Sequence, residues 1–521
     1  MTHSTPADQR YRDVHDRMAR GDRQGALAVV ETWLHDDPGD ARAHFLRGRI
    51  DLDRGLPQQA LESLVRAVEI DPGTAWFHAF LGYCRLKLGQ NAEALRCAET
   101  AAALPADDRT LDLIATIQSH LNRHRDAATT LQRAVAKGTQ IPTIFFNLAV
   151  NLKFCGDFDE AKVALERAIA LDPEHVKARA MLSELRPATR ERNQIADYEA
   201  LLQRARDPAQ RLHLCHAASR ECDALRDYDR SFAFLETGKA GMRAAIDYDF
   251  AEDKALFDAM RAFGGAKPAG GCGDERPIFV VGMPRSGTTV VDRILSGHPV
   301  VASVGETLHI SALLQELAGR RSPQLLDPRD VAPLLAHDDL SALGRAYLDR
   351  LPQPLPDRVV DKFHLNSLLA GFILRALPNA RIVCVVRGAM DTIVGNYRRL
   401  LDYRSAVYRY ALSIETIARY YVEFRKLADF WAALFPDRFR IVSYEQLIAD
   451  PDGVTREMLA FCGLDWRPGV TQIENNAAPV ATASAVQVRE PLNARSIGTW
   501  RRYQRHLEPA QRIVRDAGLD L

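Results

Sequence analysis

A repeating pattern of small residues in the first third of the chain constrains the fold more than any other feature. Its clearest members are five alanines with successive separations of 34, 34, 33 and 34 residues, namely Ala26, Ala60, Ala94, Ala127 and Ala161. Five residues before each alanine stands a residue that tolerates the left-handed conformation of a short turn: Gly21, Gly55, Gly89, Asn122 and Gly156. A fixed period over five units indicates stacked repeats rather than one globular core.

The period also indicates what each unit contains. Further alanines recur seven residues later in four units, at Ala67, Ala101, Ala134 and Ala168. A period of 34 residues with small residues at these places is typical of tetratricopeptide repeats, in which two helices form each unit. We therefore predict an α-solenoid over residues 8–185 with one concave surface, which suits a peptide or protein partner. Homo-oligomer formation or simple stiffening of the chain remains an alternative role.

Composition narrows the function classes. Lys+Arg and Asp+Glu both number 68, so bulk charge does not favour a nucleic-acid partner. The first residues lack the apolar core of a signal peptide, and no stretch reaches the roughly 18 apolar residues of a membrane span. We expect a cytoplasmic protein. The eight cysteines form no CxxC pair and no His/Cys spacing, so we expect reduced thiols and no metal site.

The rest of the chain divides into three predicted segments. Residues 186–263 keep a helical pattern but lose the period, which is typical of a capping and connecting segment. Residues 264–274 contain five glycines and are predicted to be a flexible linker. Residues 275–521 form the second predicted domain.

A glycine-rich loop opens this second domain. The apolar run 277–281 predicts a buried strand, Gly-Met-Pro-Arg-Ser-Gly-Thr-Thr follows at 282–289, and 290–296 has helical spacing. Strand, loop and helix in this order direct backbone N–H groups at an anion. The spacing is that of a nucleotide-binding P-loop, but Thr288 occupies the place of the lysine that contacts the β- and γ-phosphates. This difference argues against ATP or GTP, and so against a kinase.

Three further apolar runs predict strands at 358–361, 381–386 and 438–443, separated by helical stretches. This alternation predicts an α/β domain with a central parallel sheet, whose ligands bind at the carboxyl ends of the strands. The predicted fold class is therefore an α-solenoid followed by a P-loop-type α/β domain.

Residues 277–507 resemble the sulfotransferases that use 3′-phosphoadenosine 5′-phosphosulfate (PAPS), specifically the bacterial type fused to tetratricopeptide repeats and the tyrosylprotein sulfotransferases. The resemblance implies PAPS as donor and 3′-phosphoadenosine 5′-phosphate (PAP) as product. No metal is predicted, because no ligand cluster accompanies the loop. Together with the loop chemistry the resemblance gives these candidate cofactor-binding residues: Arg285, Ser286, Gly287, Thr288, Thr289, Arg387, Arg399, Tyr444, Ser484 and Arg489. The chain departs from the family pattern at Gly395, where a serine contacts the 3′-phosphate, at Gly388-Ala389 after Arg387, and at Thr499, where some relatives have a basic residue. Arg399 lies one helical turn beyond Gly395 and is predicted to supply the missing contact.

The candidate catalytic residues are Glu306, Lys362, Arg285 and Ser484. The resemblance assigns Glu306 as the base for the acceptor hydroxyl, since a carboxylate within hydrogen-bond reach can remove its proton. It assigns Lys362, with help from Ser484, to the negative charge on the leaving oxygen. His364 is an alternative base, but it lies outside the pattern of the histidine-dependent enzymes and is predicted to be structural.

The sequence thus predicts sulfuryl transfer from PAPS to an acceptor hydroxyl, with a tyrosine of a peptide or protein as the leading acceptor. A small molecule, sugar or lipid acceptor remains an alternative. So does a non-catalytic repeat scaffold with a degenerate transferase domain, in view of Gly395.

Overall fold

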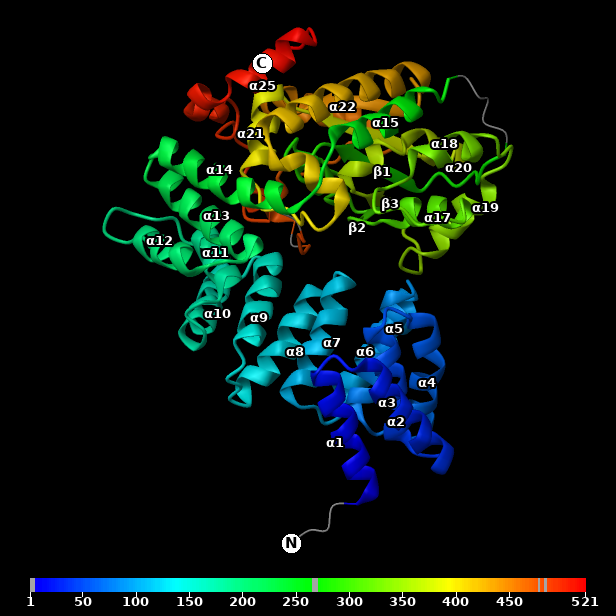
Figure 1. Cartoon of the computed structure of the whole chain (residues 1–521). Coiled ribbons are helices and arrows are strands. Elements are labelled where there is room, and N and C mark those ends of the chain that lie inside the picture. Colours follow the sequence, from blue (N-terminus) through cyan, green and yellow to red (C-terminus); the bar gives the residue numbers. More distant parts are fainter. Residues whose placement is uncertain (1–4, 265–269, 477, 482–484) are drawn as a thin grey trace. The chain divides into compact units, whose positions relative to one another are not determined.

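The computed structural model describes residues 5–264, 270–476, 478–481 and 485–521, and the chain divides into two compact units, Met1–Leu171 and Asp172–Leu521 (Figure 1). Within the described residues, no helix is both long enough and apolar enough to cross a membrane.

The first unit consists of ten helices, drawn in blue to cyan in Figure 1: α1 (Pro6–Ala19), α2 (Arg23–Asp36), α3 (Ala41–Asp53), α4 (Pro57–Ile70), α5 (Ala75–Lys87), α6 (Asn91–Ala103), α7 (Asp108–His120), α8 (His124–Ala136), α9 (Pro142–Cys155) and α10 (Phe158–Leu171). They pack as five successive pairs. The residue predicted to form each turn has a positive φ, between 59° and 95°, and the five periodic alanines are fully buried. The predicted repeat structure is confirmed.

Small residues let the paired helices approach closely. A Cβ atom added at Gly48 of α3 would lie 2.6 Å from Leu64 Cγ of α4, and a side chain there would force the two helices apart. The helix starts are fixed locally, because Asp40 and Asp107 accept hydrogen bonds from backbone N–H groups of the first turns of α3 and α7. Local capping and alanine packing together explain why each unit forms the same helical pair.

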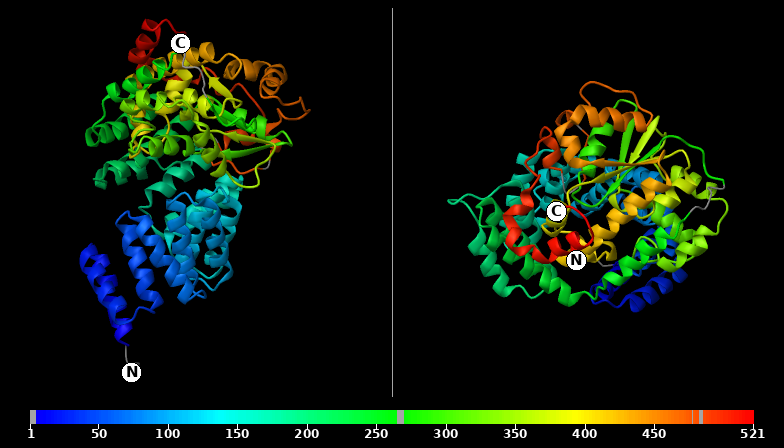
Figure 2. Two further views of the ribbon diagram at one scale, coloured as in Figure 1. Left: turned by 90° about the vertical axis from the view of Figure 1, so that its right-hand side faces the viewer. Right: turned by 90° about the horizontal axis from the view of Figure 1, so that it is seen from above.

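The second unit contains a five-stranded parallel sheet with the order β2-β3-β1-β4-β5, visible in the right panel of Figure 2. The strands are β1 (Pro277–Gly282), β2 (Val301–Gly305), β3 (Arg358–Asp361), β4 (Arg381–Val386) and β5 (Phe439–Ser443). Four of them confirm the predicted strands, and β2 is an edge strand that the sequence did not reveal. Central β1 is buried throughout, as a strand covered on both faces must be.

Helices before, between and after the strands complete this unit: α11 (Val176–Leu185), α12 (Ile195–Arg204), α13 (Pro208–Ala224), α14 (Tyr228–Ala245), α15 (Phe250–Arg261), α16 (Thr288–Ser296), α17 (His309–Leu317), α18 (Pro328–Leu335), α19 (Ser341–Asp349), α20 (Ala370–Ala376), α21 (Ala389–Tyr397), α22 (Ile414–Leu434), α23 (Tyr444–Ala449), α24 (Pro451–Phe461) and α25 (Glu508–Asp516). Helix α16 contacts four of the five strands, and α22 packs against α15, α21, α25 and β5.

The helices predicted as a capping and connecting segment lie in the same compact unit as the sheet. Lys239 of α14 donates hydrogen bonds to the Tyr403 hydroxyl at 2.5 Å and the Ala411 carbonyl at 2.7 Å, and it is 1% exposed. A buried ammonium needs such partners, because removing it from water is costly. The segment therefore packs against the α/β core. The predicted linker lies partly outside the described residues, at 265–269, and the predicted domain boundaries stay predictions.

Candidate active site

A cavity of about 540 Å³ lies at the carboxyl ends of β1, β4 and β5. Its volume is in the usual range of small-molecule sites. Seven arginines and four carboxylates contribute to its lining: Arg220, Arg285, Arg387, Arg398, Arg399, Arg495, Arg502, Glu184, Asp223, Asp391 and Glu490. The described lining therefore has an excess of three positive charges, and it suits a multiply charged anion.

The glycine-rich loop after β1 forms the floor of this cavity. Arg285 and Gly287 have φ values of 69° and 108°, and α16 begins at Thr288, so the N-terminal N–H groups of the helix face the ligand side of the loop. A Cβ atom at Gly287 would lie 2.3 Å from the Tyr444 ring, which explains the glycine. Thr288 and Thr289 line the cavity. The Ser286 hydroxyl is buried and finds no partner among the described residues.

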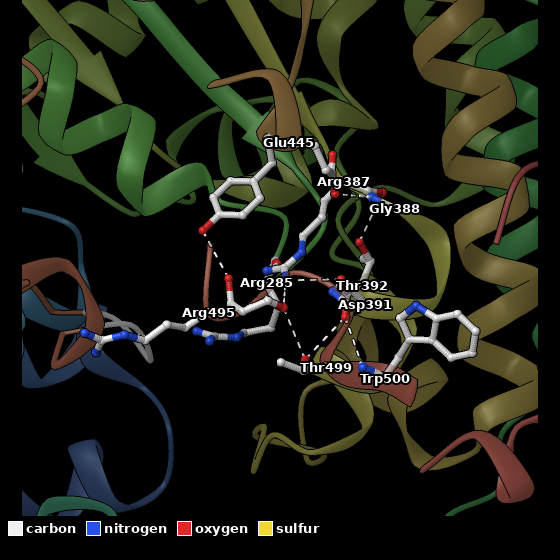
Figure 3. Close-up of polar contacts among 12 residues, drawn as sticks. Arg285, Arg387, Gly388, Asp391, Thr392, Glu445, Arg495, Thr499 and Trp500 are labelled. Atoms are coloured by element: carbon white, nitrogen blue, oxygen red, sulfur yellow. Dashed lines mark hydrogen bonds and ion pairs between the residues drawn. The ribbon is translucent and has the colours of Figure 1, made fainter. Parts of the chain in front are cut away.

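Arg387, directly after β4, forms one wall (Figure 3). Its guanidinium lies 4.7 Å from the centre of the Tyr444 ring, a cation–π distance, and donates a hydrogen bond to the Ser496 carbonyl. The Tyr444 hydroxyl lies 3.2 Å from Ser496 Oγ. These contacts hold an arginine and an aromatic face side by side, which can bind a phosphate and stack against a base.

Asp391 holds residues 496–500, called here the closing segment, against this wall. Its carboxylate accepts hydrogen bonds from the backbone N–H groups of Gly498 at 2.6 Å and Trp500 at 3.2 Å, and from the Thr499 hydroxyl at 3.3 Å. It also lies 3.5 Å from Arg387. One carboxylate on α21 thus positions both the arginine and the closing segment.

A second group of polar residues follows the other two strands. Glu306 and Lys362 come directly after β2 and β3, and Lys362 Nζ lies 2.5 Å from Glu306 Oε1. The side chain of Lys362 is 1% exposed, whereas that of Glu306 is 37% exposed. Burial would raise the pKa of Glu306, but the Lys362 ammonium outweighs it and holds that pKa below its ordinary value. Glu306 is therefore an ionised carboxylate that a solute can reach.

Both parts of the chain are similar to known proteins. Residues 277–468 match the sulfotransferase family, and residues 11–75 and 142–175 match tetratricopeptide repeats. The chain carries a sulfotransferase-family domain and tetratricopeptide repeats. Similar proteins include an uncharacterized protein of Aquifex aeolicus, 28% identical over 76% of this chain and 53% of that protein. The protein-tyrosine sulfotransferase of Drosophila melanogaster is 25% identical over 43% of this chain and 46% of its own. Protein-tyrosine sulfotransferase 1 of Mus musculus is 26% identical over 51% and 70%. The chain spans about half the length of the first two relatives.

Within the sulfotransferase domain, Arg285 lies with the binding arginines rather than with the Glu306 side. Burial, together with the nearby charges of Arg399 and Arg387, lowers the pKa of Arg285 to about 9. A Cβ atom at Gly395 would lie 3.0 Å from Arg285 Cβ. The glycine that replaces the expected serine thus leaves room for the Arg285 side chain.

The remaining predicted cofactor residues differ in whether they line the cavity. Arg399 lines the cavity, with Nη1 3.9 Å from Glu184 Oε1. Arg489 is absent from the described lining and donates to the Ala478 carbonyl at 3.3 Å, although its neighbours Val488 and Glu490 do line the cavity. Ser484 lies outside the described residues. No group of three or more His, Cys, Asp or Glu that could hold a metal occurs in the described part of the chain, and metal independence stays a prediction.

Two buried groups flank the Glu306–Lys362 pair. Burial lowers the pKa of His364 to about 4, so the imidazole is neutral at pH 7. Burial raises the pKa of Asp361 to about 7, while hydrogen bonds from Thr307 at 2.6 Å and Tyr347 at 3.0 Å oppose the rise. Sequence reasoning did not select Asp361. Its place beside Lys362 at the end of a strand was the available signal.

Proposed function

We propose that this protein transfers a sulfuryl group from PAPS to an acceptor hydroxyl. The observation that carries the proposal is the arginine-rich cavity at the glycine-rich loop, next to an ionised carboxylate paired with a buried lysine. The donor nucleotide supplies the sulfuryl group and bears a 5′-phosphosulfate and a 3′-phosphate. An excess of positive charge and a helix N-terminus fit such an anion.

The residues present fit the donor without a Walker lysine. The amides of the loop and the hydroxyls of Thr288 and Thr289 would hold the 5′ group, and Arg387 would hold a phosphate beside the Tyr444 ring. Two donors of the cavity lining, the Nε atoms of Arg387 and Arg399, lack partners within the described residues, as does Ser286 Oγ in the adjoining loop. Buried donors are normally paired, so their lack of partners supports an anionic ligand.

Glu306 and Lys362 would perform the proton and charge steps. Glu306 Oε2 or Oε1 accepts the proton of the acceptor hydroxyl as the oxygen attacks sulfur, and Lys362 Nζ stabilises negative charge on the oxygen that leaves. The same lysine keeps the carboxylate ionised before the acceptor binds. Strand β3 lies next to β1 in the sheet, so this pair stands beside the glycine-rich loop.

For the acceptor we propose a tyrosine of a peptide or protein. Two relatives are protein-tyrosine sulfotransferases by name, and tetratricopeptide arrays commonly offer an extended surface for polypeptides. Removing residues 1–171 should therefore raise the KM for a peptide acceptor while leaving PAPS affinity intact. The deletion ends at Leu171 because Ser183 and Glu184 line the cavity. An unchanged KM would favour a small acceptor.

The proposed activity is tested with ³⁵S-labelled PAPS, the purified full chain and tyrosine-containing peptides drawn from the native proteome. Labelled sulfate on tyrosine, lost in Glu306→Gln, supports the proposal. If neither peptides nor a panel of hydroxylated small molecules becomes labelled, while PAP still binds, transferase activity is contradicted and the scaffold alternative is favoured.

A further inference from the structure

One wall of the arginine-rich cavity comes from helices that precede the sulfotransferase domain. Ser183 and Glu184 lie on α11, and Ser219, Arg220 and Asp223 lie on α13. All five precede residue 277, where the match to the sulfotransferase family begins. The cavity is therefore completed by a part of the chain that the family match does not include.

This wall is held against the sulfotransferase domain by specific contacts. Asp223 accepts hydrogen bonds from Arg398 at 2.7 Å and from the Tyr503 hydroxyl at 2.5 Å. The ring of His216, one helical turn before Arg220, has Nε2 3.1 Å from the Arg398 carbonyl. Arg398 directly follows α21, and Tyr503 lies shortly before α25. Helix α13 is therefore fixed to two separate segments of the sulfotransferase domain.

Among the charged residues of this wall, Arg220 is the one available to a ligand. Asp223 pairs with Arg398, and Glu184 lies 3.9 Å from Arg399, too far for a hydrogen bond. Arg220 makes no hydrogen bond or ion pair with any residue that the structure describes, although it is half-buried. Burial lowers the pKa of Arg220 to about 10, so its guanidinium is charged at neutral pH. The charges of Glu184 and Asp223 raise this pKa, but neither carboxylate accepts a hydrogen bond from Arg220 in the described residues, so the half-buried guanidinium can bind an anion.

We propose that Arg220 binds the 3′-phosphate of the donor nucleotide, which makes the helical segment before the sulfotransferase domain part of the cofactor site. The inference rests on the proposed function. The loop and the start of α16 are the place for the 5′ group, and a second phosphate needs a second cationic place. Arg220 faces the same cavity as Arg399, four residues beyond Gly395, where the family serine is missing. Arg220 compensates for the hydroxyl that Gly395 lacks.

The test compares two nucleotides that differ only in the 3′-phosphate, PAP and 5′-AMP, by calorimetric titration of the full chain. Arg220→Gln should weaken PAP binding by about tenfold or more, the scale of a lost charge-assisted contact, and AMP binding by less than about twofold. Arg226→Gln is the matched control, because Arg226 follows the same helix, is exposed and should leave both affinities unchanged. Arg220→Lys retains the charge and should weaken PAP binding only about two- to fivefold.

The outcomes are distinguishable. Equal weakening of PAP and AMP in Arg220→Gln, or unchanged PAP binding, overturns the role of Arg220 and leaves the proposed function standing. Absence of PAP binding by the wild-type chain overturns the proposed function itself, and this inference with it. If Arg220→Gln does not fold, the ratio of the PAP affinity to the AMP affinity in Arg220→Lys, compared with wild type, decides. A fall in that ratio supports the role, and an unchanged ratio overturns it.

Discussion

The two sides of the candidate active site are built differently. On the side of β4 and β5, many arginines share one cavity, and Asp391 holds the closing segment in place through three hydrogen bonds. On the side of β2 and β3, one ion pair between Glu306 and Lys362 carries the chemistry that we propose. Binding is spread over several charges, whereas proton transfer depends on a single carboxylate. A single substitution on the Glu306 side should therefore lower turnover strongly. A single substitution on the arginine side should weaken PAP affinity by a smaller factor.

The largest effect is expected for Glu306→Gln. Turnover should fall by about 10²-fold or more, the scale of a positioned general base, because the amide cannot accept the proton. PAP affinity should stay within about twofold of wild type, since the cavity is intact. Steady-state kinetics and calorimetry measure the two effects, with the exposed Glu316→Gln as control. Retained turnover would transfer the base role to His364.

Arg387→Ala and Arg285→Ala should act in the opposite way. Each should weaken PAP by about 10- to 100-fold, because each removes charge-assisted contacts worth roughly 1.5–3 kcal/mol. Arg387 has the larger expected effect, since it also anchors Ser496 and faces Tyr444. The exposed Arg404→Ala should bind PAP normally. Near-normal PAP affinity in both variants would show that the cavity is not the cofactor site.

Asp361 gives the Glu306 side a pH dependence between about pH 4 and pH 7, below the range in which the arginines of the other side titrate. Its pKa rises from near 4 in an unfolded chain to about 7 here, so the stability that its proton confers is fully present below about pH 4 and is lost as pH rises through 7. Asp361→Asn should therefore gain about 2–3 kcal/mol relative to wild type between pH 5 and pH 8, because wild type loses about 1.4 kcal/mol for each pH unit between pH 5 and pH 7. Denaturant unfolding at both pH values measures this. A difference that is independent of pH would contradict the raised pKa.

The smallest effect is expected for Gly395→Ser, which restores the family residue. We expect PAP affinity to fall about two- to fivefold rather than rise, because the new Cβ would press on Arg285 at 3.0 Å. Gly388→Ser, where a Cβ would meet only Glu445 Oε1 at 3.4 Å, is a milder comparison in the same segment. A gain in affinity for Gly395→Ser would show that Arg285 adapts and that the hydroxyl is simply missing.

The local features of the fold were predictable from the sequence, and the long-range ones were not. The turn residues and buried alanines of the repeats follow from a period that each unit repeats, and four strands follow from apolar runs such as 381–386. Strand β2 was not predicted, because only Val301 in it is buried and its sequence therefore contains no apolar run. Arg220 escaped because it lies on a helix far before the loop, and only tertiary packing brings the two together. Arg489 matched the family pattern, but the described cavity lining does not include it.

The most direct test of the account is a calorimetric titration of the full chain with PAP and, separately, with ATP and Mg²⁺. The arginine-rich cavity and the threonine at position 288 predict saturable PAP binding at least tenfold tighter than that of ATP with Mg²⁺. Absence of PAP binding, or tighter binding of ATP with Mg²⁺, would contradict the claim that this cavity is a site for the donor nucleotide of sulfuryl transfer.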